Sequence, residues 1–185
     1  MNAQTYLETH WIAHAVWKRL EMPVHQDRLK RCAEYVRAGA GARYIDVGCG
    51  LGHSTDIMRR FVPGDWTGLE FWPEAKAMAI KAFPDIDVCV SLDFNLRPVC
   101  GTFDGVVCSE VLEHVPDDVA LVKGLLDITA GTLCLTTPNR KVNDPGHLRV
   151  YTRAMLEALF PEAEIHSIGR FFYVIVKRQA RQGDL

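Results

Sequence analysis

Apolar and polar positions along the chain follow two periods, one typical of helices and one typical of strands. Residues 5–20 and 25–38 have apolar side chains at three- and four-residue steps, which predicts two amphipathic helices. Gly39 and Gly41 stop the second of them, and short β-type runs then alternate with helical stretches. The predicted strands are 43–47, 66–70, 86–90, 103–108, 132–136, 164–168 and 171–176, and the further helices are 53–62, 74–83, 117–128 and 152–159.

Strands separated by helices of this length predict right-handed βαβ crossovers and a parallel sheet with both faces covered. The last two runs meet at Gly169, which predicts an antiparallel hairpin. We therefore expect an α/β fold, a three-layer α/β/α sandwich whose seven-stranded sheet is mostly parallel. Residues 1–185 read as a single domain, with a helical cap over 1–40 and the core over 41–178. Ligands bind such sheets at the carboxyl ends of the strands.

Composition narrows the classes of protein. Apolar residues make up 48% and charged residues 24%, and the net charge is −2, so nothing global favours nucleic acid. We find neither a signal-peptide pattern nor an apolar run near the roughly 18 residues of a membrane span, so a cytoplasmic protein without membrane contact is expected. The six cysteines contain no Cys-x-x-Cys pair, which predicts buried free thiols.

The first core strand runs into a glycine-rich turn that contains Gly48, Gly50 and Gly52. Its spacing is Gly-x-Gly-x-Gly, which differs from the Gly-x-Gly-x-x-Gly of dinucleotide folds and from a P-loop. Asp46 stands two residues before the first glycine. A carboxylate there would repel a pyrophosphate but suits a cationic ligand such as an aminoacyl sulfonium.

Acidic residues also follow the next two strands. Glu70 ends the second strand, at the place where Rossmann-type folds hold the two hydroxyls of a ribose. Asp93 follows the third strand, where a carboxylate can accept the amino group of an adenine. Phe94 or Trp72 could stack on the ring.

The chain from residue 43 to about 177 resembles the class I S-adenosylmethionine-dependent methyltransferases of the ubiquinone-pathway O-methyltransferase type. The residues that carry this resemblance are Asp46–Gly52, Glu70, Asp93 and the segment Phe103–Val115. The resemblance implies a Rossmann-like fold, with the glycine loop under the methionine moiety, Glu70 on the ribose, Asp93 and Phe94 around the adenine, and Ser109 and Glu110 near the sulfonium. The implied cofactor residues are Asp46, Gly48, Cys49, Gly50, Gly52, Glu70, Phe71, Trp72, Asp93, Phe94, Ser109 and Glu110.

A polar cluster follows the fourth strand. Glu110, Glu113 and His114 stand at i, i+3 and i+4, so one helical turn would present them on one face, and His147 follows the fifth strand. All four together predict a divalent metal site, with Mg, Mn, Fe and Zn open. Alternatively, His114 or His147 acts as a general base oriented by Glu113, which makes these three the candidate catalytic residues. In the third interpretation, Glu113 and His114 have a structural role and hold the loop in place by capping and hydrogen bonding.

These patterns predict an S-adenosylmethionine-dependent methyltransferase that acts on a hydroxyl or amine of a small-molecule acceptor. The Glu-x-x-Glu-His pattern also resembles the enzymes that 2′-O-methylate RNA 3′ ends with help from a metal. A nicotinamide-dependent oxidoreductase and a non-catalytic cofactor-binding subunit are alternatives from other classes. Tyr6, Trp11 and Trp17 would cover the cleft or pack in the core, and the basic run from Arg28 to Arg37 predicts a solvated helix face.

Overall fold

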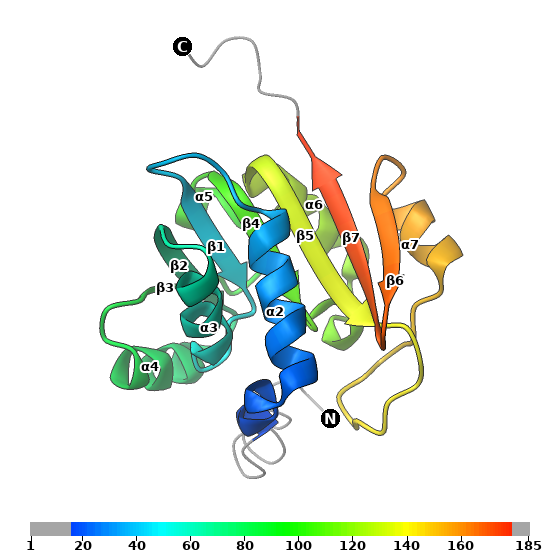
Figure 1. The fold of residues 1–185 in the computed structure, drawn as a ribbon, viewed down its shortest axis with the longest axis horizontal. Coiled ribbons are helices and arrows are strands. Elements are labelled where there is room, and N and C mark those ends of the chain that lie inside the picture. The colour runs from blue at the N-terminus through cyan, green and yellow to red at the C-terminus, as the bar shows by residue number, and fades with distance from the viewer. Residues whose placement is uncertain (1–15, 179–185) are drawn as a thin grey trace.

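The computed structural model describes residues 16–178, which form one seven-stranded sheet between layers of helices (Figure 1). The strand order is β3-β2-β1-β4-β5-β7-β6. β1 to β5 pair in parallel, whereas β7 runs antiparallel between β5 and β6, as expected for the C-terminal hairpin. The strands are β1 (Arg43–Val47), β2 (Asp65–Glu70), β3 (Asp87–Val90), β4 (Phe103–Ser109), β5 (Thr129–Pro138), β6 (Glu164–Ile168) and β7 (Phe171–Lys177).

The helices follow the predicted order, with changes at the amino end and between β3 and β4. They are η2 (Val16–Glu21), α2 (Pro23–Tyr35), α3 (His53–Phe61), α4 (Pro73–Ala82), α5 (Arg97–Cys100), η3 (Leu112–His114), α6 (Asp118–Ile128) and α7 (Arg153–Leu159). The prediction of an α-helix up to residue 20 is wrong over 16–20, where the chain forms a 3-10 helix; residues 5–15 lie outside the described residues. Met22 precedes Pro23 and is extended, because proline disfavours helical backbone in the residue before it.

Alternate strand residues feed two apolar cores, one on each face of the sheet. Tyr44 on β1, Val107 on β4 and Cys134 on β5 pack with α2 and α3, whereas Val47, Val106 and Leu133 pack with α6 and α7. Successive side chains of a strand point to opposite faces, so a strand that is buried on both sides is apolar along most of its length. Figure 1 shows the resulting layers, with α2 and α3 in front of the sheet and α6 behind it.

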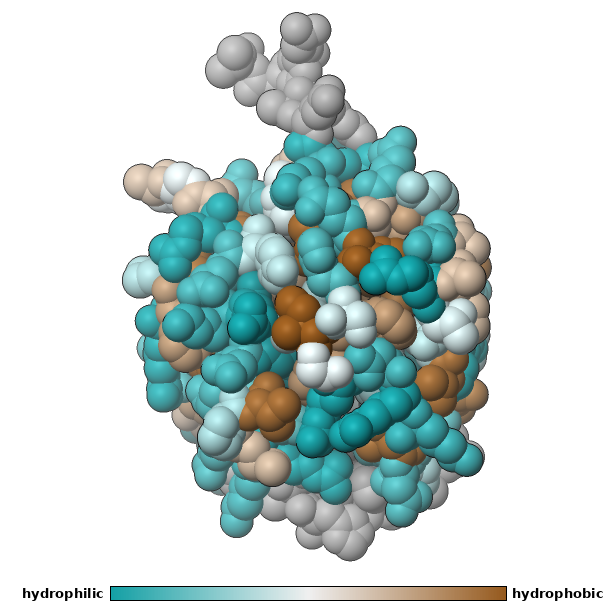
Figure 2. All heavy atoms as spheres, turned by 45° about the vertical axis from the view of Figure 1, so that its right-hand side comes forward, coloured by the Kyte–Doolittle hydropathy of each residue, from teal (hydrophilic) through white to brown (hydrophobic). Residues whose placement is uncertain are grey.

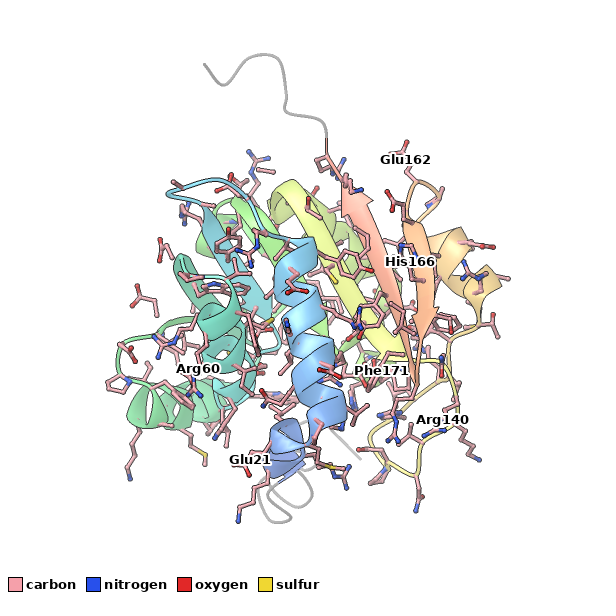
Figure 3. The ribbon with its side chains drawn as sticks, viewed as in Figure 1. Glu21, Arg60, Arg140, Glu162, His166 and Phe171 are labelled. Carbon is pink, nitrogen blue, oxygen red and sulfur yellow. The ribbon has the colours of Figure 1, made fainter. Side chains whose placement is uncertain are left out.

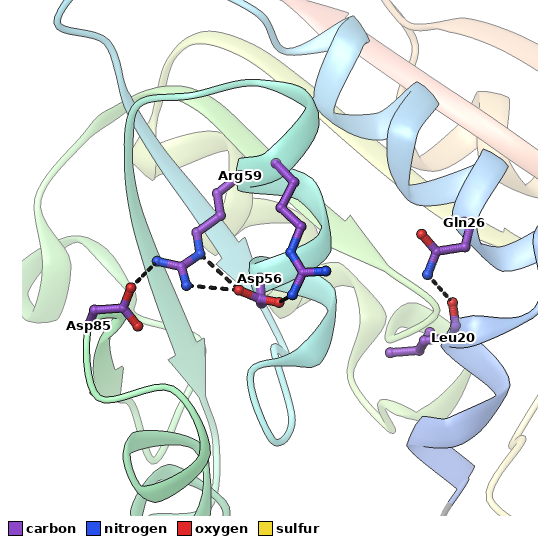
Figure 4. Close-up of polar contacts among 6 residues, drawn as sticks. Leu20, Gln26, Asp56, Arg59 and Asp85 are labelled. Carbon is purple, nitrogen blue, oxygen red and sulfur yellow. Dashed lines mark hydrogen bonds and ion pairs between the residues drawn. The ribbon is translucent and has the colours of Figure 1, made fainter.

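Helix α3, which begins directly after the glycine loop, is fixed by charged contacts (Figure 4). Asp56 is buried and pairs with both Arg59 and Arg60 one turn further on. Arg59 Nη1 also reaches Asp85 Oδ2 at 2.6 Å, in the segment before β3. The start of α2 is tied back in a similar way, because Gln26 Nε2 donates to the Leu20 carbonyl at 2.6 Å. These contacts tie α3 to the segment before β3 and α2 to η2.

The face shown in Figure 2 is mainly hydrophilic, with hydrophobic side chains in small groups. No helix within residues 16–178 is long and apolar enough to cross a membrane. All six cysteines are free, and Cys32, Cys49, Cys108 and Cys134 are buried as expected. For Cys89 and Cys100 the expectation of burial is wrong, since both are partly exposed.

Candidate active site

The glycine loop lies where the carboxyl ends of β1, β2 and β4 meet. Gly48 has φ 78°, and a Cβ at this position would stand 2.4 Å from Val111 Cγ2 in the segment after β4. The amides of Gly48 and Cys49 donate to the Leu69 carbonyl at 2.8 and 3.0 Å. Only glycine tolerates both the left-handed backbone and the close approach to Val111. Gly48 therefore lets the loop pack directly against the segment after β4.

Asp46 is buried beneath the loop and faces the first turn of α3. Its Oδ2 accepts hydrogen bonds from the hydroxyls of Ser54 at 2.6 Å and Thr55 at 2.8 Å. Burial raises the pKa of Asp46, and the two hydroxyls oppose that effect. The carboxylate therefore anchors the loop to α3, and a direct contact with a cationic ligand remains a prediction.

Glu70 closes the loop from the side of β2. Its Oε2 accepts the Gly50 amide at 2.7 Å, and its Oε1 accepts the Phe71 amide at 2.6 Å. Burial raises the pKa of Glu70 to about 7, against the opposing effect of these backbone donors. The carboxyl group thus stands at the end of β2, as predicted, and ionises near neutral pH.

The segment after β3 lies beside the end of β2. Phe94 contacts Phe71 edge to face, with ring centroids 5.4 Å apart. Asp93 is exposed, and its Oδ1 accepts the Asn95 amide at 2.9 Å. Trp72 is partly buried at the residue before α4. These aromatic side chains and the exposed acid can line a site for a planar base, which stays a prediction.

The prediction that Glu110, Glu113 and His114 share one helical turn is wrong. Glu110 has φ 59°, outside any right-handed helix, and only Leu112–His114 form a 3-10 turn. The Glu110 amide donates to the Thr136 carbonyl on β5 at 2.9 Å, which continues the sheet pairing past β4 and forces the sharp turn. Ser109 follows the same edge, with its hydroxyl 2.8 Å from that of Thr136.

Glu110 meets a residue that the sequence analysis assigned to solvent. Arg28 on α2 is only 4% exposed, its Nη1 lies 3.3 Å from Glu110 Oε2, and its guanidinium stands 4.9 Å from the centroid of the Phe171 ring. The expectation of a solvated face is therefore wrong for Arg28. Because it stands four residues before Cys32 in the buried stripe of α2, helical periodicity was the signal that could have found it.

Glu113, His114 and His147 come together at the ends of β4 and β5. One possible ligand atom from each lies within 4.8 Å of the others, and Glu110 is not in this group. The two imidazole rings meet edge to face at 4.6 Å, and His147 Nε2 lies 4.0 Å from Glu113 Oε1. Thr137 donates to the other Glu113 oxygen at 3.1 Å. The structure thus joins the three predicted catalytic residues.

The charges in this group are set by burial. Burial raises the pKa of Glu113 well above its ordinary value, and the neighbouring Glu110 adds to the effect. Burial lowers the pKa of His147, so this imidazole is neutral at neutral pH. Glu113 Oε1 accepts no hydrogen bond from the described residues. One carboxylate and two imidazoles with an unsatisfied oxygen fit either a proton shared with a histidine or a divalent metal.

The loop between β5 and α7 holds His147 at this edge. The Leu148 amide donates to the Glu113 carbonyl at 2.9 Å, and the buried Tyr151 donates its hydroxyl to Asp118 Oδ2 at 2.8 Å. Arg149 pairs with the same Asp118. The loop encloses a hollow of about 340 Å³ lined by residues from Lys141 to Val150, including His147. Sequence reasoning did not identify Arg149 and Asp118 as positioning residues.

Comparisons with known proteins identify the family of this chain. A family model described as a methyltransferase domain matches residues 16–172. The ubiquinone biosynthesis O-methyltransferase of Xanthomonas campestris pv. campestris (strain B100) is 35% identical over 109 residues, which are 54% of this chain and 44% of that protein. The chain therefore spans less than half the length of this relative.

Solved structures show the same fold. A TehB-like S-adenosylmethionine-dependent methyltransferase from Corynebacterium glutamicum aligns with TM-score 0.70 and 16% identity, over 93% of this chain and all of that one. CalS10, an amino pentose methyltransferase from Micromonospora echinaspora solved with bound S-adenosylmethionine, aligns with TM-score 0.67 and 19% identity, over 90% of this chain and 97% of that one. The family match also decides against the oxidoreductase alternative. The chain belongs to the class I S-adenosylmethionine-dependent methyltransferases.

Proposed function

We propose that this enzyme transfers the methyl group of S-adenosylmethionine to a hydroxyl or amine of a small-molecule acceptor, with His147 as the general base. The observation that carries the proposal is the position of His147, which lines the hollow of the β5–α7 loop and lies 4.0 Å from buried Glu113. A base must stand within reach of the acceptor proton, and a neutral imidazole can accept it.

The cofactor would lie across the ends of β1, β2 and β3. The glycine loop would underlie the methionine moiety, Glu70 would accept the ribose hydroxyls, and Phe94 with Asp93 would face the adenine. A methionine moiety also carries a carboxylate. Arg28 supports this placement because it is a buried cation whose Nε has no hydrogen-bond partner among the described residues.

Methyl transfer then needs a proton acceptor and a counter-charge. Bound S-adenosylmethionine supplies a sulfonium methyl group, which the acceptor's lone pair takes as the carbon–sulfur bond breaks and its electron pair returns to sulfur. His147 takes the acceptor proton, and Glu113 faces the imidazolium that forms. His114 packs edge to face on His147 and limits its rotation.

The acceptor would enter over the β5–α7 loop. Val142, Leu148 and Val150 are exposed around the hollow, at 37%, 53% and 41%, and Lys141 lines it as well. An acceptor with an apolar body and one nucleophilic hydroxyl or amine suits these walls.

A second candidate is metal-assisted 2′-O-methylation of RNA 3′ ends. The observation that favours it is the group of Glu113, His114 and His147, whose possible ligand atoms lie within 4.8 Å of one another. These residues would hold a divalent ion, which would acidify a ribose hydroxyl when bound. The net charge of −2 gives no general attraction for RNA.

Calorimetric titration with S-adenosylhomocysteine is the first test, with Glu70→Gln and the exposed neighbour Glu74→Gln as a matched pair. Micromolar binding that only Glu70→Gln weakens supports the cofactor site. Transfer from labelled S-adenosylmethionine is then measured on phenols, alcohols and amines, and on a short RNA with manganese or with a chelator. Turnover confined to RNA plus manganese would overturn the small-molecule proposal in favour of the second candidate.

A further inference from the structure

Two cysteines outside the active site line the same hollow. Cys89 lies on β3 and Cys100 ends α5, both are partly exposed, and both border a hollow of about 310 Å³ that also contains Arg43 and Lys76. Arg43 is the first residue of β1, so this hollow lies toward the amino end of the sheet, away from the glycine loop. Neither thiol takes part in the proposed methyl transfer.

The two thiols are neighbours, and each lies near a backbone carbonyl. Both thiols border the same hollow, and the elements that carry them, α5 and β3, contact each other. Cys89 Sγ lies 3.5 Å from the Gly68 carbonyl oxygen, and Cys100 Sγ lies 3.1 Å from that of Leu96. The neighbouring Cys100 thiol lowers the pKa of Cys89, and the charge of Lys76 also favours the Cys89 thiolate. Because Lys76 lines the hollow beside Cys89, and the Cys100 thiol donates to the Leu96 carbonyl, we take Cys89 as the nucleophile and Cys100 as the thiol that keeps its proton.

Cys32 and Cys134 provide a matched pair without access. Both lie in one apolar core cluster between α2 and the sheet, and both are 0% exposed. Burial raises the pKa of Cys134 well above its ordinary value. Each pair therefore consists of two neighbouring thiols, but of the two pairs only Cys89 and Cys100 border a hollow that a reagent can enter.

We propose that Cys89 and Cys100 form a peroxide-reactive dithiol site that closes to a disulfide. Cys89 sulfur attacks one peroxide oxygen, the O–O bond breaks, and hydroxide leaves as Cys89 becomes a sulfenic acid. The Cys100 sulfur then attacks that sulfur, the S–O bond breaks, and the hydroxyl departs as water with the Cys100 proton. Two thiols are oxidised, and one hydroperoxide is reduced to water or an alcohol plus water.

The disulfide would act on a segment of the proposed cofactor site, and this consequence alone rests on the proposed function. Residues 89–100 would become a closed ring that contains Asp93 and Phe94. Disulfide formation removes the thiol hydrogen that Cys100 donates to Leu96, two residues after Phe94. We expect oxidised protein to bind S-adenosylhomocysteine several-fold more weakly than reduced protein.

The test treats the full, reduced chain with stoichiometric hydrogen peroxide, blocks remaining thiols with N-ethylmaleimide in denaturant, and maps the peptides. Cleavage before aspartates separates Cys89, in 87–92, from Cys100, in 93–103. We expect these two peptides to be linked, while Cys32 and Cys134 are recovered alkylated. Recovery of both peptides unlinked, or equal oxidation of Cys32 and Cys134, overturns the proposal.

Two variants separate the roles of the thiols. Cys100→Ser should leave a Cys89 sulfenic acid that dimedone traps, whereas Cys89→Ser should leave Cys100 unmodified; the reverse pattern overturns the assignment. Titration with S-adenosylhomocysteine runs in parallel. If reduced protein fails to bind, the proposed function falls while the peptide map still decides the dithiol site. If reduced and oxidised proteins bind equally, only the link to the cofactor segment is overturned.

Discussion

At the ends of β1 and β2, the buried carboxylates of Asp46 and Glu70 each accept two hydrogen bonds from loop and helix groups. At the ends of β4 and β5, Glu110 depends on Arg28 and a threonine. Glu113 receives one bond from Thr137, and its second oxygen receives none from the described residues. We call these two regions the β1–β2 half and the β4–β5 half of the site. Both bury acids, but among the described residues the buried carboxylate oxygen without a hydrogen-bond partner, Glu113 Oε1, lies in the β4–β5 half.

This difference indicates that the β1–β2 half is a preformed binding surface and that the β4–β5 half is a reactive one. Buried polar groups with all their partners hold a loop in one arrangement, whereas an unsatisfied oxygen beside a neutral imidazole favours the arrival of a proton, a cation or a ligand. We therefore expect the β1–β2 half to control cofactor binding. The β4–β5 half should control the rate of transfer.

The sharpest test of the division is His147→Asn. Removal of a general base costs about 10²- to 10⁴-fold in rate, so kcat should fall by that range while the Kd for S-adenosylhomocysteine changes less than about twofold. The control is His166→Asn, a partly exposed histidine on β6 (Figure 3), which should leave kcat unchanged. Equal losses of kcat and cofactor affinity in His147→Asn would contradict the assignment of catalysis to one half and cofactor binding to the other.

Arg28→Ala should show the largest loss of stability. It leaves the Glu110 carboxylate without the guanidinium that pairs with it, and such an uncompensated charge costs about 3 kcal/mol of unfolding free energy. Urea denaturation measures the loss. Arg31→Ala, on the exposed side of the same helix, is the matched control.

The double variant Arg28→Ala with Glu110→Gln distinguishes charge from packing. Neutralising Glu110 should recover more than half of the lost unfolding free energy if charge is the cause. If the double variant is as unstable as Arg28→Ala, the loss comes from packing of Arg28 against Phe171 instead.

The two halves also differ in how far sequence predicts them. The succession of strands and helices along the chain, the glycine loop and the position of Glu70 follow from local signals, because strand and helix periods and the turn glycines act over a few residues. The helical face assumed for Glu110 fails because β5 extends the sheet pairing to that residue. Arg28 and the contact between His147 and Glu113 depend on tertiary packing, which no local pattern specifies.

Gly124→Ala tests whether packing holds the segment after β3, which carries Asp93 and Phe94 and is proposed to face the adenine. A Cβ at Gly124 on α6 would stand 2.1 Å from the Phe94 carbonyl oxygen, so α6 or the segment must move. Overpacking of this kind costs about 2 kcal/mol, and we expect weaker binding of S-adenosylhomocysteine with it. Gly39→Ala is the control, since nothing lies within 4 Å of its Cβ. Unchanged binding in Gly124→Ala would show that the segment adapts.

The smallest expected effect is a pH dependence of cofactor binding through Glu70. Its pKa is raised from 4.5 to about 7, so the folded protein holds the proton that the unfolded chain releases near pH 4.5. A raised carboxyl pKa stabilises the fold most below pH 4.5, and this contribution is lost as pH rises to 7. Glu70→Gln should therefore gain stability relative to wild type between pH 4.5 and 7.

Cofactor binding should change in the opposite direction, because only the ionised carboxylate can accept both ribose hydroxyls. With the pKa near 7, most Glu70 side chains are protonated at pH 6, and the Kd for S-adenosylhomocysteine should be about tenfold higher there than at pH 8.5. Calorimetry across this range measures the change, and Glu70→Gln should bind weakly at every pH. A flat wild-type profile would mean that Glu70 stays bonded to the Gly50 amide and serves the loop rather than the ligand.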